Sequence, residues 1–176
     1  PNSWINVECP DANDLTYLID DLKVPESFLK DIADTDERPR IETEGNWLLT
    51  IFRVAIPNGN GDTDTPYTTA PIGVLTNNDS IVTVCYYRTE MLRDFIQYSR
   101  RKEIKVRNKL DLILRLLHSS AVWFLKYLKQ IQIDVKRAEM ELARSIRNEE
   151  LQNLMKLQST MVYFNTSIRG NQVVTS

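Results

Sequence analysis

One apolar repeat constrains this chain more than any other feature, because it runs from Leu110 to Leu142 in steps of four and three residues. Such spacing forms a heptad seam, along which one helix packs against another with a left-handed supercoil. If they are helical throughout, these 33 residues span about 50 Å, whereas a domain of 176 residues is about 35 Å across. We therefore expect a helix that is longer than the body of its domain. The seam consists of Leu110, Leu114, Leu117, Ala121, Phe124, Leu128, Ile131, Val135, Ala138 and Leu142.

A protruding helix needs a surface that covers its seam, and the sequence leaves two partners open. The seam can pack on the chain's own sheet and on a following helix. It can also form part of an oligomer interface, because a helix longer than its domain otherwise exposes apolar residues to water. The large side chains of Trp123, Phe124 and Tyr127 favour a covered surface.

The composition is that of one globular domain with a real core. The chain has 42% hydrophobic and 26% charged residues and a net charge of -2, so no overall field points to nucleic acid. Cys9 and Cys85 stand far apart without a CxxC motif, which predicts two reduced, partly buried thiols. No signal peptide and no apolar run of about 18 to 20 residues is present, so we expect a soluble chain. Since it begins at Pro1 without methionine, we expect cut or processed ends.

The first half of the chain alternates β-forming segments with short helices. Asp11, or Asn13 with Asp14, can cap a helix that runs through residue 22, and a second short helix follows Pro25. Gly45 and Asn46 form a predicted hairpin turn, and residues 58–69 form a polar loop. Strands are predicted over residues 4–9, 40–43, 47–56, 72–76 and 80–87, and helices over 11–22, 26–33 and from Thr89 or Glu90 onward.

After the long helix, a second apolar series predicts an antiparallel partner. The seam stops near residues 145–148, and Asn148 followed by two glutamates reads as a new helix start. Gly170 is the expected stop of this helix. Strands and helices in this mixed order predict an α/β/α sandwich with at least some antiparallel pairing. The second apolar series consists of Leu151, Leu154, Leu157, Met161, Phe164 and Ile168.

The residues give little support to catalysis. His118 is the single histidine, and the five glycines form no phosphate-binding loop, so we expect no enzyme. His118 is either a hydrogen-bonding residue on the flank of the seam or a metal ligand. An acidic cluster could hold a hard cation through its oxygens, or it could be a solvated turn. The members of this cluster are Asp31, Asp34, Asp36 and Glu37.

A basic run precedes the long helix and leaves two interpretations open. It could bind phosphate or an anionic membrane surface, or it could be a solvated junction. It lacks interleaved aromatic residues, so we expect no nucleic-acid binding. The run consists of Arg100, Arg101, Lys102, Lys105, Arg107 and Lys109.

The order of several short motifs makes a family resemblance visible. Lys30-Asp31-Ile32, followed by Glu37-Arg38-Pro39-Arg40-Ile41-Glu42, resembles the cytoplasmic domain of CorA-type divalent-cation transporters. The opening Trp4-Ile5-Asn6, the hairpin strands 71–76 and 78–84, and the two long helices are similar to the family in the same order. The resemblance covers nearly all 176 residues.

This resemblance implies an α/β fold: an αβα sandwich with a mixed, largely antiparallel sheet over residues 1–107, followed by a long helical hairpin over residues 108–176. It implies a cytoplasmic regulatory and metal-sensing domain on the cytoplasmic face of the inner membrane. The whole transporter would be a homopentamer that reaches the membrane through a C-terminal transmembrane region absent from this chain. The stalk helix and the Gly-Met-Asn signature of the family are also absent.

The resemblance also implies divalent cations bound between neighbouring subunits. Asp31 matches one acid of the family's acidic pair, whereas Lys30 departs from the other. His118 falls, in one register, on the position of the acid in the long helix, and imidazole is a softer ligand that suits zinc better than magnesium. The implied metal ligands are thus Asp31 and His118, and the implied ion is Mg²⁺, with Co²⁺ or Zn²⁺ as alternatives. Ions bridging the subunits would hold the ring closed.

Two other functions stay open at this point. The chain could belong to the zinc-transporting ZntB branch, which shares the fold. It could instead be a freestanding helical-hairpin module that docks a partner protein through its seam. A reading frame that continues into two apolar stretches of about 20 residues would favour a transporter over the module.

Overall fold

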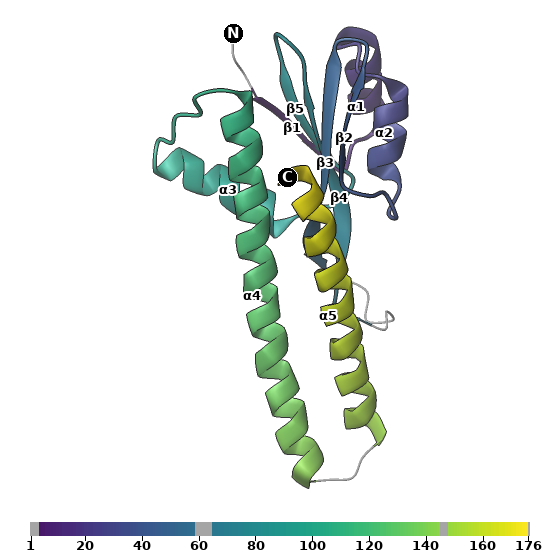
Figure 1. Ribbon diagram of the computed structural model, residues 1–176, viewed down its shortest axis with the longest axis vertical. Coiled ribbons are helices and arrows are strands. Elements are labelled where there is room, and N and C mark those ends of the chain that lie inside the picture. Colours follow the sequence, from purple (N-terminus) through teal and green to yellow (C-terminus); the bar gives the residue numbers. More distant parts are fainter. Residues whose placement is uncertain (1–3, 59–64, 145–147, 176) are drawn as a thin grey trace.

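The computed structural model describes residues 4–58, 65–144 and 148–175. Short elements fill the first hundred residues, and two long helices follow them (Figure 1). The elements in chain order are β1 (Trp4–Glu8), α1 (Ala12–Thr16), the π-helical turn η1 (Tyr17–Asp21), α2 (Glu26–Ala33), β2 (Arg40–Glu44), β3 (Trp47–Pro57), β4 (Tyr67–Thr76), β5 (Ile81–Cys85), α3 (Glu90–Arg101), α4 (Lys109–Arg144) and α5 (Asn148–Thr175).

A five-stranded sheet in the order β1-β5-β4-β3-β2 forms the centre of the molecule. β1 runs parallel to β5, and the other neighbours are antiparallel. The predicted mixed, largely antiparallel sheet is therefore confirmed. β3 and β4 are the longest strands and are buried on both faces, which agrees with their nearly continuous apolar and β-branched sequences.

Helices cover both faces of the sheet, so the predicted αβα sandwich is confirmed (Figure 1). The alternation of side chains along β3 sends Leu49 and Ile51 into one core and Phe52 and Val54 into another. The first core lies under α1, η1 and α2, and the second lies under α3 and α4. A third core, between α4 and α5, includes Phe164.

The ends of the short helices follow the predicted capping residues. The Asp11 side chain accepts the N–H groups of Asn13 and Asp14, and Asp14 returns a bond to the Asp11 backbone, which completes a capping box. The Thr89 side chain caps α3 in the same way, through the N–H of Leu92. The predicted helix over residues 11–22 is present, but only its first half is α-helical; its second half is the π-helical turn η1.

The two long helices form an antiparallel hairpin that extends past the sheet (Figure 1). α4 has 36 residues and is therefore about 54 Å long. The buried residues Phe124 and Ile131 of α4 meet Leu157 and Phe164 of α5 in the third core. The division at residues 107 and 108 into a body and a hairpin stays a prediction.

The predicted seam is correct only in the half of α4 that faces α5. Near the start of α4, Leu110 is 62% exposed and Leu114 is 51% exposed, whereas Leu112 and Leu116 are buried. This part of the helix packs on the sheet and on α3, so its buried face is turned away from the heptad positions. From Phe124 onward the seam faces α5 as predicted.

Two predicted boundaries are wrong. α5 does not end at Gly170 but continues to Thr175. The glycine instead allows α5 to pack closely against Pro39, since a Cβ at position 170 would lie 3.1 Å from Cγ of Pro39. The predicted loop over residues 58–69 is shorter at its end, since β4 begins at Tyr67, which pairs with Pro57 of β3. The part of that loop at residues 59–64 lies outside the described residues.

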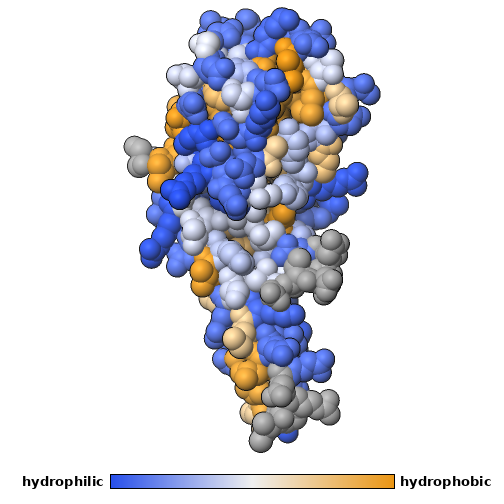
Figure 2. Space-filling model, turned by 90° about the vertical axis from the view of Figure 1, so that its right-hand side faces the viewer, coloured by the Kyte–Doolittle hydropathy of each residue, from blue (hydrophilic) through white to orange (hydrophobic). Residues whose placement is uncertain are grey.

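Apolar side chains lie on the surface of the hairpin. Figure 2 shows hydrophobic patches on the helical end that extends beyond the sheet. On α5, Leu151 is 49% exposed, Met155 60% and Val162 64%. Within the described residues, no helix combines the length and the apolar run that a membrane crossing requires.

Candidate functional site

The predicted ligand Asp31 lies in the last turn of α2, beside the buried Ile32. Apolar residues at Phe28, Leu29 and Ile32 fix the buried face of this helix, so the Asp31 carboxylate comes to the surface at its edge. It is 33% exposed and accepts a hydrogen bond of 2.6 Å from Nη2 of Arg40 on β2. The carboxylate is thus already paired within the chain.

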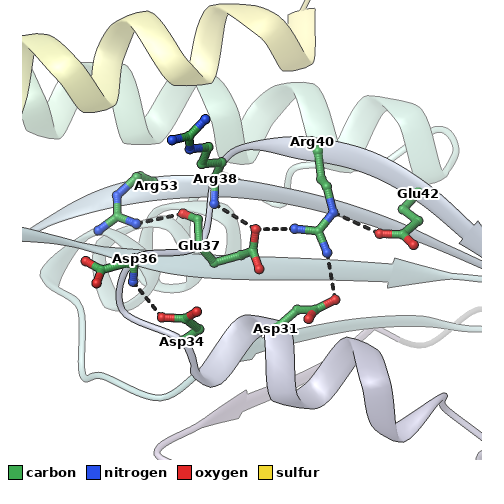
Figure 3. Close-up of polar contacts among 8 residues, drawn as sticks. All are labelled: Asp31, Asp34, Asp36, Glu37, Arg38, Arg40, Glu42 and Arg53. Carbon is green, nitrogen blue, oxygen red and sulfur yellow. Dashed lines mark hydrogen bonds and ion pairs between the residues drawn. The ribbon is translucent and has the colours of Figure 1, made fainter.

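Arg40 holds three carboxylates at once, those of Asp31, Glu37 and Glu42 (Figure 3). Its Nε lies 2.8 Å from Glu42, and Nη1 contacts Glu37. Burial alone would lower the pKa of Arg40, but the hydrogen bond to Glu42 and the charge of Glu37 outweigh it and raise that pKa. A network of this kind orders its members more than an isolated surface ion pair does.

The predicted acidic cluster continues into the connection between α2 and β2, which we call the acidic turn (residues 34–37). The Asp34 side chain accepts the N–H of Asp36 at 2.9 Å, and the Asp34 carbonyl accepts the N–H of Glu37. These local bonds are typical of an Asx turn. The aspartates therefore shape the turn, while the side chains of Asp34 and Asp36 remain exposed.

A second arginine, Arg53 on β3, holds the backbone of this turn. Its guanidinium donates to the carbonyl oxygens of Thr35 and Glu37, each at 2.8 Å. Burial lowers the pKa of Arg53, although the nearby charges of Asp36 and Asp34 oppose that shift. We did not predict a role for Arg53, although one signal was available: it is the single charged residue in the apolar run of residues 47–56.

The second predicted ligand, His118, lies apart from Asp31. It is exposed on α4, which packs on the opposite face of the sheet from α2. Within the described residues, no group of three or more histidine, cysteine, aspartate or glutamate residues could hold a metal ion. The assignment of Asp31 and His118 as ligands therefore stays a prediction, and one chain does not bring them to a common ion.

The basic run ends at the start of α4. The Asp111 side chain accepts bonds from the N–H of Arg107 and from Nε of Arg115, which hold the pKa of Asp111 below its usual value. Lys109 Nζ contacts the carbonyl of Asn77. A cavity of about 540 Å³ lies beside this helix start, between Trp4 and the basic residues. These bonds fit the structural interpretation of the run as a junction.

Comparisons with known proteins agree with this fold. The family model described as CorA-like Mg²⁺ transporter protein matches residues 2–176. The complete CorA magnesium transporter from Methanocaldococcus jannaschii superposes with a TM-score of 0.83 at 21% identity, over 97% of this chain and 53% of that one. The soluble domain of the same CorA gives a TM-score of 0.81 at 20% identity, over 97% of this chain and 67% of that one.

A third solved structure shares the fold. The ZntB cytoplasmic domain from Vibrio parahaemolyticus gives a TM-score of 0.71 at 15% identity, over 99% of this chain and 67% of that one. At such identities the likeness shows the fold alone. Among curated proteins, no sequence matches this chain significantly.

The chain spans about half of the length of the complete transporter that it resembles. The family model, by contrast, covers this chain almost from end to end, and it agrees with the family that the motifs around Asp31 predict. The chain therefore belongs to the CorA-like Mg²⁺ transporter family.

Proposed function

We propose that this chain is the cytoplasmic regulatory and metal-sensing domain of a CorA-like divalent-cation transporter. The observation that carries the proposal is the family match over residues 2–176. The chain spans 53% of the complete CorA structure, which leaves room in such a transporter for a separate membrane part. The match favours this function over a freestanding interaction module.

The surface of the helical hairpin supports a homo-oligomeric arrangement. Leu114, Leu125 and Ile133 of α4 are 51%, 65% and 45% exposed, although the same helix is buried elsewhere. Apolar side chains gathered on one element mark a contact surface. We propose that neighbouring subunits, five in the whole transporter, cover this surface.

The placement of the predicted ligands supports ion binding between subunits rather than within one chain. Asp31 and His118 lie on opposite sides of the sheet, so a shared ion would join Asp31 of one subunit to His118 of the next. An ion bound by the Asp31 carboxylate of one subunit and the His118 imidazole of the next would attract both ligands and bridge the interface. Bound cations would hold the ring closed, and their loss at low magnesium would loosen it.

Arg40 sets the strength expected of such a site. Because it already neutralises part of the charge of Asp31, a cation has to share the carboxylate or displace the guanidinium. We therefore expect weak and readily reversible binding, as a sensor requires. Mg²⁺ is the first candidate ion, and Co²⁺ or Zn²⁺ are alternatives.

A zinc-transporting function of the ZntB kind is the second candidate. The exposed imidazole of His118 favours it, because nitrogen ligands suit zinc better than magnesium. The similarity to the ZntB cytoplasmic domain is compatible with either ion.

Calorimetric titration of the assembled full-length transporter tests the proposal. With MgCl₂ as titrant, we expect saturable binding that Asp31→Asn weakens at least about tenfold. Asparagine keeps an oxygen for Arg40, so the change removes charge with little disturbance of the fold. Asp79→Asn, at an exposed aspartate in the β4–β5 turn, is the matched control and should bind as the unchanged protein does.

Two further results would decide between the ions or reject the site. His118→Ala should weaken Zn²⁺ binding more than Mg²⁺ binding if the ZntB-like function holds. Saturable binding that neither Asp31→Asn nor His118→Ala changes would remove both residues from the site. The absence of any saturable divalent binding would reject the sensor function itself.

A further inference from the structure

Arg53 occupies an unusual place in the sheet. It lies in the middle of β3, between the buried residues Phe52 and Val54. β2 pairs with β3 only as far as Ile51, so the backbone of Arg53 lies just beyond the end of its neighbouring strand. A charged side chain in such a position is costly unless its hydrogen bonds are met.

The side chain of Arg53 meets this need with neutral acceptors. Nη1 donates to the carbonyl of Glu37, and Nη2 donates to the carbonyls of Thr35 and Thr69, all at 2.8 Å. Nε donates to Oγ1 of Thr69 at 3.0 Å. Arg53 therefore binds the backbone of the acidic turn and of β4. Because its acceptors are not carboxylates, the acidic side chains of the turn stay available to other partners.

The backbone of the same residue holds both long helices. Its N–H donates to Oδ1 of Asn171 on α5 at 2.7 Å, and its carbonyl accepts from Nδ2 of Asn171 at 2.8 Å. The carbonyl also accepts from Oγ of Ser120 on α4 at 3.1 Å. The Asn171 amide thus makes the pair of bonds that a further strand would make.

Two more contacts tie the same stretch of α5 to this region. Oγ of Ser167 lies 2.8 Å from Oγ1 of Thr69, and both side chains are buried. One turn later, Gly170 approaches Pro39, which follows the acidic turn, so closely that a Cβ would lie 3.1 Å from its Cγ. Residues 167, 170 and 171 therefore seat α5 against Thr69, Pro39 and Arg53.

We propose that Arg53 is a positioning residue that couples the acidic turn to the helical hairpin. Its side chain holds the acidic turn, and its backbone holds α4 and α5. A displacement of the turn should therefore displace the hairpin, and a displacement of the hairpin should displace the turn. The inference concerns this chain alone and stands whether or not an ion binds at Asp31. Coupling of this kind needs a contiguous network and a direct test of both ends.

Arg40 provides a matched control within the same cluster. It also contacts Glu37, but its bonds go to the side-chain carboxylates of Asp31, Glu37 and Glu42 (Figure 3). A change at Arg40 should therefore disturb the charge cluster and leave the hairpin in place. Arg53 and Arg40 carry the same charge, so the comparison separates position from electrostatics.

Residue-resolved hydrogen exchange on this chain tests the coupling from the turn. For Arg53→Met we expect exchange to rise about threefold to tenfold both in residues 34–37 and in residues 167–173 of α5, the effect of losing one or two net hydrogen bonds. Arg53→Lys should behave similarly, because an ammonium cannot reproduce the planar fork of the guanidinium. Arg40→Met should raise exchange near α2, the acidic turn and β2, but not in residues 167–173 of α5.

The reverse experiment starts from the helix. The hydrogen bonds of Asn171 go to the backbone of Arg53, so any effect of Asn171→Ala on the turn has to pass through the packed contacts described above. We expect Asn171→Ala to raise exchange in residues 34–37 as well as in α5. Amides of β5 that exchange by global unfolding serve as the reference for overall stability.

The outcomes are distinct. Enhanced exchange at both ends, beyond the change at the β5 amides, supports the coupling. Enhancement confined to the end that carries the substitution would overturn it, and so would an equal rise at every amide, which reports loss of stability alone. Normal exchange in Arg53→Lys would show that a positive charge at this position suffices without the forked hydrogen bonds of the guanidinium, and would overturn the role given to those bonds.

Discussion

The helices on the two faces of the sheet complete the molecule in different ways. α1, η1 and α2 cover a closed core, in which Leu18, Phe28 and Ile32 are at most 1% exposed. α4 and α5 extend past the sheet and leave Leu125 65% exposed and Val162 64% exposed. The helices of the chain itself thus fully cover the core on one face of the sheet. On the other face, α4 and α5 leave apolar side chains exposed, and such a surface is of the kind that a neighbouring protein covers. Substitutions on the two faces should therefore differ in their effects on stability and association.

The largest effect is expected where the hairpin meets the sheet. Phe164 of α5 is fully buried and packs edge-to-face on Phe124 of α4, with ring centroids 5.3 Å apart. Phe164→Ala removes this filling, and we expect a loss of about 3–5 kcal/mol in the free energy of unfolding, measured with urea. Tyr163→Ala, at a side chain that is 50% exposed, should cost less than about 0.5 kcal/mol.

A cost for Phe164→Ala below about 1 kcal/mol would show that the hairpin is only loosely seated on the sheet. In that case α4 and α5 would pack less firmly on the sheet than their buried side chains indicate, and the two faces would differ in packing as well as in exposed apolar surface. Equal costs for Phe164→Ala and Tyr163→Ala would contradict the burial on which the comparison rests.

The next effect concerns the closed face. A Cβ at Gly73 of β4 would overlap Cδ1 of Ile32 on α2 and would lie 2.6 Å from its Cγ1. We expect Gly73→Ala to cost about 1–3 kcal/mol through overpacking, again by urea unfolding. In the double variant with Ile32→Ala, the new methyl group enters the space that isoleucine leaves. The combined cost should then be smaller than the sum of the two single costs, and strict additivity would argue against this close contact.

A third effect depends on pH and probes the core under the hairpin. Burial of Cys85 raises the pKa of its thiol from 9.0 to about 12. Since the folded pKa is above the unfolded one, this contribution to stability is complete below pH 9 and is lost as the pH rises toward 12. Over that window we expect unfolding free energy to fall by up to about 1.4 kcal/mol per pH unit from this group.

Urea unfolding between pH 8 and pH 10.5 measures this slope. Cys85→Ala should flatten it more than Cys9→Ala does, because burial is the main cause of the Cys85 shift and Cys9 is exposed. The same difference should appear in thiol labelling of the folded chain, where Cys9 reacts and Cys85 does not. A slope that Cys85→Ala fails to change would mean that water reaches this core.

The smallest effect on the single chain is expected at the open face. Leu125→Ser should change the stability of this chain by less than about 0.5 kcal/mol, because the side chain is 65% exposed. In the full-length transporter the same substitution should weaken subunit association, as seen by light scattering on dilution. Tyr17→Ser, at an exposed residue of the closed face, is the control. Equal behaviour of both variants in the oligomer would break the comparison between the faces.

Local patterns in the sequence predicted much of the fold. The apolar residues of 26–33 and the start at Pro25 gave the bounds of α2, and the Asp11 and Thr89 caps begin their helices as expected. These features depend on neighbours within one or two turns. The alternation along β3 and the hairpin of β4 and β5 are similarly local, which explains why the sheet could be predicted.

Features that depend on distant packing could not be read in this way. The buried face of α4 turns toward Leu112 and Leu116 because the sheet and α3, and not an antiparallel partner along the seam, lie beneath it. Gly170 does not end α5, because the glycine serves a contact with Pro39. Both differences come from tertiary contacts that override a local signal.

The candidate site shows the same division. The acidic residues, including Asp31, were visible as a cluster, but their pairing with Arg40 requires β2 to lie beside α2. Arg53 was noticeable only as a charge within an apolar run. No sequence pattern indicated that its backbone would bind Asn171, 118 residues away. Whether Asp31 and His118 bind a cation remains a prediction.

The amide of Asn171 also has a practical consequence for handling this protein. Unpaired strand edges invite association with other chains and lead to aggregation. Beyond Ile51, β3 has no strand neighbour on its β2 side within the described residues, and Asn171 occupies the peptide of Arg53 there. A version trimmed before residue 171 would uncover this apolar strand during expression. Shortened forms intended for crystallisation or spectroscopy should therefore retain the last turns of α5.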